Sequence, residues 1–212
     1  MKTQIRIASL VLLTILGLML AVAPAMAGTL YSNGPYNGNK NAWGINFGDV
    51  VTDSTNLNSS RSNVYGIDFV YWDASEADLL TTVDVSLGSA PFGTDIFSGT
   101  LTGANNTFLG TNEFGYALYE ASYSFANIEV PGGTSYLTLS NACATSGCDT
   151  NPIYWDENSG PSTAYQNTLG SIPSEAFTLI GTSGATPEPS SLILFGSGVL
   201  GLAGVLRRRL MG

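Results

Sequence analysis

Two tryptophans that each precede an acid are the first residues that could do chemistry. Trp72 precedes Asp73, and Trp155 precedes Asp156 and Glu157. An indole face can stack on a sugar ring, while neighbouring carboxylates accept hydrogen bonds from sugar hydroxyls. The pattern therefore predicts a carbohydrate-binding surface. The alternative is that the tryptophans fill the interior, because a domain with few Leu and Ile needs other large apolar side chains.

The segment "DTNPIYWDEN" is the second candidate site. Asp149, Asp156 and Glu157 bring hard oxygen ligands to one short stretch of chain, as Ca²⁺ requires. The alternative is that these residues close Asx turns beside a strand. The sequence indicates no cofactor other than Ca²⁺.

Catalysis is not expected. The sequence contains no histidine, which removes the usual general base and the usual partner of a Ser or Cys nucleophile. Glycoside cleavage by paired carboxylates stays open. Its candidate acids are Glu76, Glu113, Glu120 and Glu157.

Cys143 and Cys148 are the only cysteines, in "CATSGC". An even number of cysteines in an exported chain predicts a disulfide. Two thiols without any histidine cannot complete the usual zinc site. The bond closes a very short loop, so it should stiffen that loop without holding the fold together.

A period of two in hydrophobicity runs through the middle of the chain. "TTVDVSL" puts Val83, Val85 and Leu87 on one face, and "YGIDFVYW" and "ALYEASYSF" alternate in the same way. This alternation is typical of half-buried strands in antiparallel sheets. We therefore expect an all-β domain over residues 28–181, an antiparallel, jelly-roll-like β-sandwich of roughly eight to ten short strands.

Turn residues separate these runs. The breaks include "NGPYNGN", "NLNSSRSN", "GSAPFG", "TGANN", "VPGG" and "ENSGPS". Gly supplies positive φ, and Asn, Asp and Ser hydrogen-bond to their own backbone. We expect the chain to turn between strands at each of them.

Residues 1–27 have the pattern of a secretory signal. Lys2 and Arg6 precede an apolar run over residues 7–20, and Ala25 and Ala27 form a small-x-small cleavage site. The mature chain should then begin at Gly28 after passage through the secretion machinery. The alternative is a first membrane anchor that stays attached.

The charge of the central domain excludes nucleic-acid binding. Residues 28–186 hold two of the seven basic residues and fifteen of the sixteen acids, a net charge of −13. Such a field repels phosphate backbones and anionic lipid head groups.

The last part of the chain is predicted to insert in a membrane. A linker over residues 182–189 precedes an uncharged stretch over 190–206, which as a helix spans about 25 Å. Arg207, Arg208 and Arg209 follow, in a tail over residues 207–212. Basic residues fix their side of a span as cytoplasmic, so the domain should lie outside the cytoplasm.

Pro187, Glu188 and Pro189, followed by the apolar span and the arginine cluster, resemble the PEP-CTERM sorting signal. The resemblance covers residues 187–212. It implies a Gram-negative exporter, processing by an exosortase at the membrane, and a final place at the cell surface or in an exopolysaccharide or biofilm matrix.

These observations lead to one expected function and two rivals. We expect an exported, surface-sorted protein without enzymatic activity, structural or adhesive in the extracellular matrix. The first rival is a carbohydrate-binding module that also binds Ca²⁺. The second is a hydrolase that acts on glycans.

Overall fold

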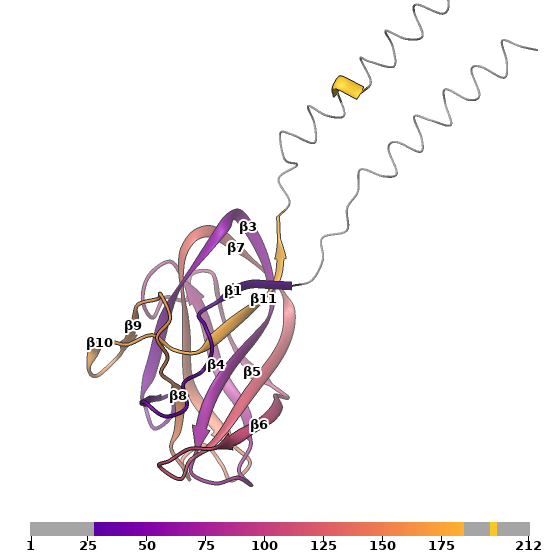
Figure 1. Cartoon of the computed structure of the whole chain (residues 1–212). Helices are drawn as coiled ribbons and strands as arrows, with labels where there is room; N and C mark the ends of the chain where they lie inside the picture. Colours follow the sequence, from indigo (N-terminus) through magenta and orange to yellow (C-terminus); the bar gives the residue numbers. More distant parts are fainter. Residues whose placement is uncertain (1–27, 185–195, 199–212) are drawn as a thin grey trace, which may run out of the picture.

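The computed structural model describes residues 28–184 and 196–198 (Figure 1). Residues 28–184 form eleven strands, where the sequence predicted eight to ten. The strands are β1 (Gly28–Ser32), β2 (Ala42–Gly44), β3 (Val50–Asp73), β4 (Leu80–Gly88), β5 (Phe97–Thr102), β6 (Asn105–Thr111), β7 (Ala117–Ala144), β8 (Ile153–Asp156), β9 (Ala164–Gln166), β10 (Gly170–Ile172) and β11 (Phe177–Ser183).

All strand pairs in this region are antiparallel, which confirms the predicted all-β, antiparallel fold. Hydrogen bonds join the strands in one sheet with the order β1-β11-β3-β7-β4-β5. The other strands attach to this path: β6 to β7, β8 and β9 to β3, β2 to β8, and β10 to β9.

Two strands are far longer than the sequence predicted. β3 has 24 residues and β7 has 28, and they pair along most of their length. The expected turns at "NLNSSRSN" and "VPGG" lie inside these strands, so the prediction that the chain turns back at both was wrong. The two segments face one another, with Leu57 opposite Gly133 and Arg61 opposite Pro131, and the register shifts between these pairs. Gly and Pro therefore mark an irregularity in a ladder that continues.

The two halves of β3 have different neighbours. Residues 51–53 pair with β9, and the half of β7 that faces residues 50–57 also pairs with β4. Residues 62–73 pair with β11 and β8, and the half of β7 opposite them pairs with β6. The irregularity thus separates two groups of strands, while the jelly-roll sandwich itself stays a prediction.

The predicted alternation of faces is confirmed in β4. Val83, Val85 and Leu87 are buried in the hydrophobic core, while Asp84 lies on the opposite face of the strand and is half-buried. The core also takes side chains from β3, β7, β8 and β11, including Ile67, Leu139, Trp155 and Leu179. Burial of these apolar side chains is the main stabilising contribution to the fold.

Both ends of the domain lie side by side. Gly28 pairs with Gly181, so β1 starts where β11 ends (Figure 1). β11 continues to Ser183, which pairs with Ser62. The linker therefore cannot begin at residue 182 as predicted, because hydrogen bonds to β3 keep residues 182 and 183 in the sheet.

The predicted signal helix over 1–27 lies outside the described residues. So does the predicted membrane helix over 190–206, apart from residues 196–198, which are helical. Among residues 28–184 and 196–198, no helix has the length and apolar character to cross a bilayer.

Candidate functional site

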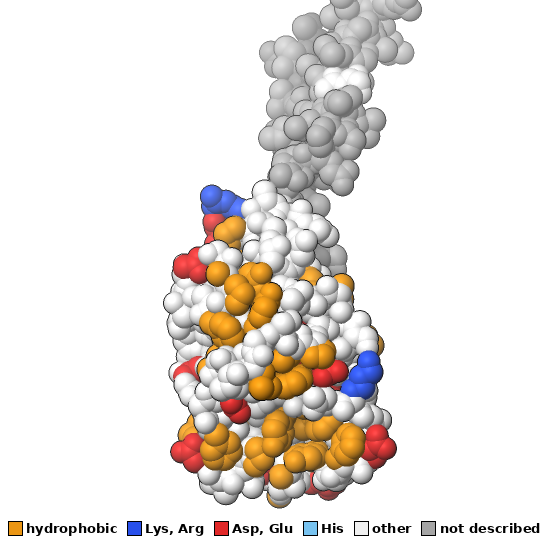
Figure 2. All heavy atoms as spheres, turned by 90° about the vertical axis from the view of Figure 1, so that its left-hand side faces the viewer, with side chains coloured by type: hydrophobic (Ala, Val, Ile, Leu, Met, Phe, Trp, Pro, Cys, Tyr) orange, Lys and Arg blue, Asp and Glu red, His pale blue; other side chains and the backbone are white. Residues whose placement is uncertain are grey.

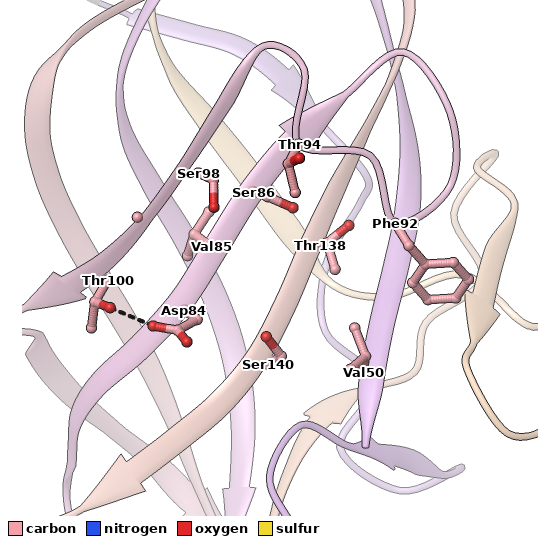
Figure 3. A pocket seen from close by; sticks show the side chains of 11 residues that line it. Val50, Asp84, Val85, Ser86, Phe92, Thr94, Ser98, Thr100, Thr138 and Ser140 are labelled. Carbon is pink, nitrogen blue, oxygen red and sulfur yellow. Dashed lines mark hydrogen bonds between the residues drawn. The ribbon is translucent and has the colours of Figure 1, made fainter. Parts of the chain in front are cut away.

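A hollow of about 290 Å³ opens on the outer side of β4 (Figure 3). We call it the β4 hollow. It lies across β3, β4, β5 and β7, under the connection from β4 to β5. Its lining residues are Val50, Asp84, Val85, Ser86, Phe92, Thr94, Ser98, Gly99, Thr100, Thr138 and Ser140. Six of these side chains carry hydroxyls and one carries a carboxylate, so the hollow is a hydrogen-bonding surface.

The strand alternation places these polar groups on one face. In β7, Thr138 and Ser140 alternate with the buried Leu137 and Leu139. In β4, Ser86 follows the same rule. Because successive side chains point to opposite sides of a strand, the core-facing residues fix the direction of the hydroxyls.

Asp84 is the only acid in the lining. Its Oδ1 accepts a hydrogen bond from Thr100 Oγ1 at 2.5 Å, and its Oδ2 accepts one from Asn141 Nδ2 at 2.8 Å. Two neighbours thus hold the carboxylate in place while it remains half-buried. Within residues 28–184, the hydroxyls of Ser98 and Ser140 have no side-chain hydrogen bond to the protein, so they are free to bond a ligand.

Phe92 stands at the rim of the hollow, beside Val50 (Figure 3). Its side chain is 38% exposed, and its φ of 61° is a left-handed conformation that costs about 1–2 kcal/mol for a residue with a Cβ. The backbone here approaches β4 so closely that a Cβ on Gly88 would lie 2.4 Å from Gly93 Cα. The glycines thus let the loop fold down and hold an aromatic ring at the rim.

A second hollow, of about 210 Å³, lies over β3, β7 and β11. Asp68 and Glu120 line it, with Tyr36 and Thr178. Glu120 pairs with Val70 across the ladder, so Asp68 and Glu120 are diagonal neighbours, with Cα atoms about 7–8 Å apart.

Exposed apolar side chains are also present outside the two hollows. The side of the domain that carries β8, β9 and β10 shows groups of hydrophobic side chains among scattered acids (Figure 2). Over residues 28–184 as a whole, the large exposed hydrophobic side chains include Phe47, Phe114 and Leu169. Exposed apolar side chains are common on protein surfaces and carry no site by themselves.

The predicted sugar-stacking residues do not share an exposed face. Trp72, Asp73, Trp155, Asp156 and Glu157 are all buried, with at most 9% of each exposed. Trp155 is fully enclosed and donates its Nε1–H to the carbonyl of Ala176 at 2.9 Å. The tryptophans therefore fill the interior, because they supply the bulk that the few Leu and Ile do not.

Asp156 holds neighbouring segments together. Its Oδ1 accepts hydrogen bonds from Trp72 Nε1 at 2.6 Å and from the Gly38 N–H at 2.9 Å, and its Oδ2 accepts one from the Asn37 N–H at 2.8 Å. Burial raises the pKa of Asp156, and these bonds oppose that rise. Glu157 accepts a hydrogen bond from Trp43 Nε1 at 3.3 Å.

The structure does not assemble the predicted Ca²⁺ ligands. Asp149 is exposed on the loop before β8, whereas Asp156 and Glu157 are buried and bonded to N–H donors. Across residues 28–184 and 196–198, no three or more Asp, Glu, Cys or His side chains are grouped to hold a metal ion. Proximity in sequence did not group these ligands, because Asp156 and Glu157 are buried while Asp149 stays on the exposed loop.

The predicted disulfide between Cys143 and Cys148 is present. Its loop is docked on Asp78, which accepts hydrogen bonds from Thr145 Oγ1 and the Ser146 N–H, both at 2.8 Å, and from Asn151 Nδ2 at 2.9 Å. Burial alone would raise the pKa of Asp78, but these bonds outweigh it and lower the pKa to about 2.

Replacing both cysteines by serine should cost little stability. The closed loop is short, so the chain-entropy model gives about 2 kcal/mol, and the bonds to Asp78 remain. Urea unfolding of the double variant and the parent, both under oxidising conditions, measures this. A loss far above that value would mean that the disulfide holds more of the fold than its own loop.

Sequence reasoning missed the β4 hollow. The signal that could have found it is the polar half of the alternation in "TTVDVSL", followed by the turn sequence "GSAPFG". That signal says which face is polar, but not that a loop closes over it to form a hollow.

Residues 185–209 match the family model described as the PEP-CTERM protein-sorting motif. The chain carries this sorting motif. The PEP-CTERM match confirms the resemblance drawn from Pro187, Glu188, Pro189 and the arginine cluster, and it indicates an exported protein sorted by an exosortase. The matched residues lie outside the described part of the chain, apart from 196–198. A comparison with curated proteins finds no match for this chain.

Proposed function

We propose that this exported protein binds a neutral polysaccharide in the β4 hollow and acts as a structural or adhesive component of an exopolysaccharide or biofilm matrix. The observation that carries the proposal is the lining of that hollow: hydroxyls, one oriented carboxylate and an exposed phenylalanine at the rim. Ring faces can pack on Phe92, while sugar hydroxyls exchange hydrogen bonds with Asp84 and the Ser and Thr side chains.

The charge of the domain selects the class of glycan. With fifteen acids and two basic residues over 28–186, an anionic polysaccharide is repelled, whereas a neutral one is not. The hollow itself contains one carboxylate and no cation. We therefore propose a ligand without carboxylate or sulfate groups.

The proposed display follows from the two ends of the domain. A signal over 1–27 and an anchor over 190–206 would both connect to the domain at one place, where β1 starts and β11 ends. An exosortase would cleave the anchor or hold it in the membrane. The β4 hollow, which lies over other strands, stays free for a ligand. We also infer a two-layered, jelly-roll-like arrangement, supported by the exchange of strand neighbours along β3 and β7.

We propose a binding role without catalysis, because hydrolysis by two carboxylates needs a pair and the β4 hollow has only Asp84. One observation favours hydrolysis elsewhere. Asp68 and Glu120 line the second hollow together as diagonal neighbours on one face of the sheet, and they are the pair of carboxyl groups that such hydrolysis needs. Release of reducing ends from neutral glucans, lost in Glu120→Gln, would establish that activity.

Titration of neutral and anionic polysaccharides into the exported protein tests the binding proposal. We expect binding to a neutral glycan that falls about tenfold or more in Asp84→Ala, since a hydrogen bond to a charged group contributes about 1.5–3 kcal/mol. Phe92→Ala should weaken binding to a similar degree.

The control variants change the same residue types, Phe and Asp, at other positions on the surface. Phe108→Ala removes a phenylalanine that is 50% exposed on β6, and Asp68→Asn alters an acid of the second hollow. Both should leave affinity unchanged. Equal losses in the controls, or binding only to anionic polysaccharides, would reject the β4 hollow as the site.

A further inference from the structure

The domain buries a pair of acids that the proposed function does not use. Glu175 lies between β10 and β11 and is fully buried, and Asp53 of β3 is equally enclosed. The Glu175 N–H donates to Asp53 Oδ2 at 2.7 Å, which brings the two residues together across 122 positions of sequence. Their burial is unusual, because carboxylates are almost never enclosed without a partner.

Three oxygens of this pair have no partner. Both Glu175 carboxylate oxygens and Asp53 Oδ1 are buried without a hydrogen bond. By contrast, Asp53 Oδ2 accepts three, from Asn33 Nδ2 at 3.1 Å, Ser162 Oγ at 2.9 Å and the Glu175 N–H. Donors thus fix one side of Asp53 and leave the other side open.

No basic side chain neutralises the pair. Lys40 and Arg61 are the only two over residues 28–186, and Lys40 donates to Ser159 while Arg61 pairs with Glu129. Two buried carboxyl groups with three unbonded oxygens and no basic partner are therefore arranged to take a cation from solution.

An uncharged side chain with an oxygen that can ligate a cation lies in the same region. β9 places Ala164 opposite Asp53, and Gln166, two residues further on, points to the same side of the strand. Gln166 Oε1 is also buried without a partner. Carboxylate and amide oxygens together are the ligands that Ca²⁺ takes in proteins, with a flexible geometry that Mg²⁺ does not tolerate.

We propose that Glu175 and Asp53 form a buried Ca²⁺ site, with Gln166 as a further oxygen ligand. The ion would join β3, β9 and the segment before β11 from the inside. It would also stiffen β3 next to Thr52, which accepts a hydrogen bond from Thr138 of the β4 hollow at 2.9 Å. The site differs from the exposed loop at Asp149 and does not depend on glycan binding.

Thermal unfolding of the full exported protein in about 5 mM Ca²⁺ and in chelator tests the site. We expect one bound Ca²⁺ per chain by equilibrium dialysis and a melting temperature several degrees higher with Ca²⁺. Tb³⁺ bound there should luminesce through Trp155, whose Nε1 bonds the carbonyl of the residue after Glu175. Na⁺ at matched ionic strength should give none of these effects.

Glu175→Gln and Asp53→Asn should each abolish the Ca²⁺ shift and the Tb³⁺ emission, and the two variants cover the case that one of them does not fold. Asp95→Asn, a change in an exposed acid, should keep both signals. The proposal is overturned if dialysis finds no bound Ca²⁺, if Na⁺ reproduces the shift, or if either folded variant responds as the parent does.

Discussion

Trp155→Ala should lower the stability of the domain by about 3–5 kcal/mol, as large-to-small changes in a packed core do. The indole is fully enclosed, with Phe69 and Phe177 at ring-centroid distances of 6.2 and 5.7 Å in edge-on contact. The change also removes the shorter of two hydrogen bonds to the carbonyl of Ala176, which keeps only the Val70 N–H at 3.3 Å. Because a domain of this size has only about 5–15 kcal/mol of stability, the variant should melt on the order of 10 °C lower.

Phe114→Ala is the matched control for Trp155→Ala. Phe114 is 55% exposed and stacks on Trp72 from outside, so its loss should cost well under half as much. Differential scanning calorimetry of both variants measures the contrast. A Trp155→Ala protein that melts like the parent but has lost glycan binding would restore the sugar-stacking role that the sequence alone suggested.

Asp73 ends β3, and Asp78 lies two residues before β4. The contributions of these two acids to the stability of the fold should change with pH in opposite directions. Burial raises the pKa of Asp73 to about 6, and the charge of Asp78 adds to the rise. Asp78 instead has a pKa of about 2 because the disulfide loop donates hydrogen bonds to it. An acid with a raised pKa destabilises the fold increasingly as pH rises from its unfolded pKa, about 4, to its folded pKa. An acid with a lowered pKa stabilises the fold fully above about pH 4, and this stabilisation is lost as pH falls to its folded pKa.

Asp73→Asn should match the parent below about pH 4, gain stability over the parent as pH rises from about 4 to 6, and keep a nearly constant advantage above 6. The gain at pH 8 should approach about 3 kcal/mol, the value of a two-unit shift in pKa. Asp78→Asn should be less stable than the parent at pH 7, by about 2 kcal/mol, with the difference shrinking as pH falls from 4 toward 2.

Urea unfolding in chelator across this pH range gives both profiles. Asn is close to Asp in shape, so each variant mainly removes the charge. Parallel profiles for the two variants would show that the pKa values of the two acids are not shifted in opposite directions.

The sequence by itself determined those features of the protein that depend on a short stretch of chain. Alternation with a period of two set which residues of β4 enter the core, because successive side chains of a strand point to opposite sides. The even cysteine count of an exported chain predicted the disulfide between Cys143 and Cys148, since an oxidising compartment pairs the two thiols that the chain contains. The sorting motif was readable because it is a linear signal, carried by Pro187, Glu188, Pro189 and the arginines that follow.

Only the tertiary structure decided where those patterns lie relative to one another. "NLNSSRSN" and "VPGG" look like turns locally, yet they face each other inside one ladder, because pairing between β3 and β7 outweighs the local preference for a turn. Trp155 is buried and Phe92 exposed, although both types suit either place. The β4 hollow and the Asp53–Glu175 pair each join residues tens of positions or more apart, and no local pattern specifies such a contact.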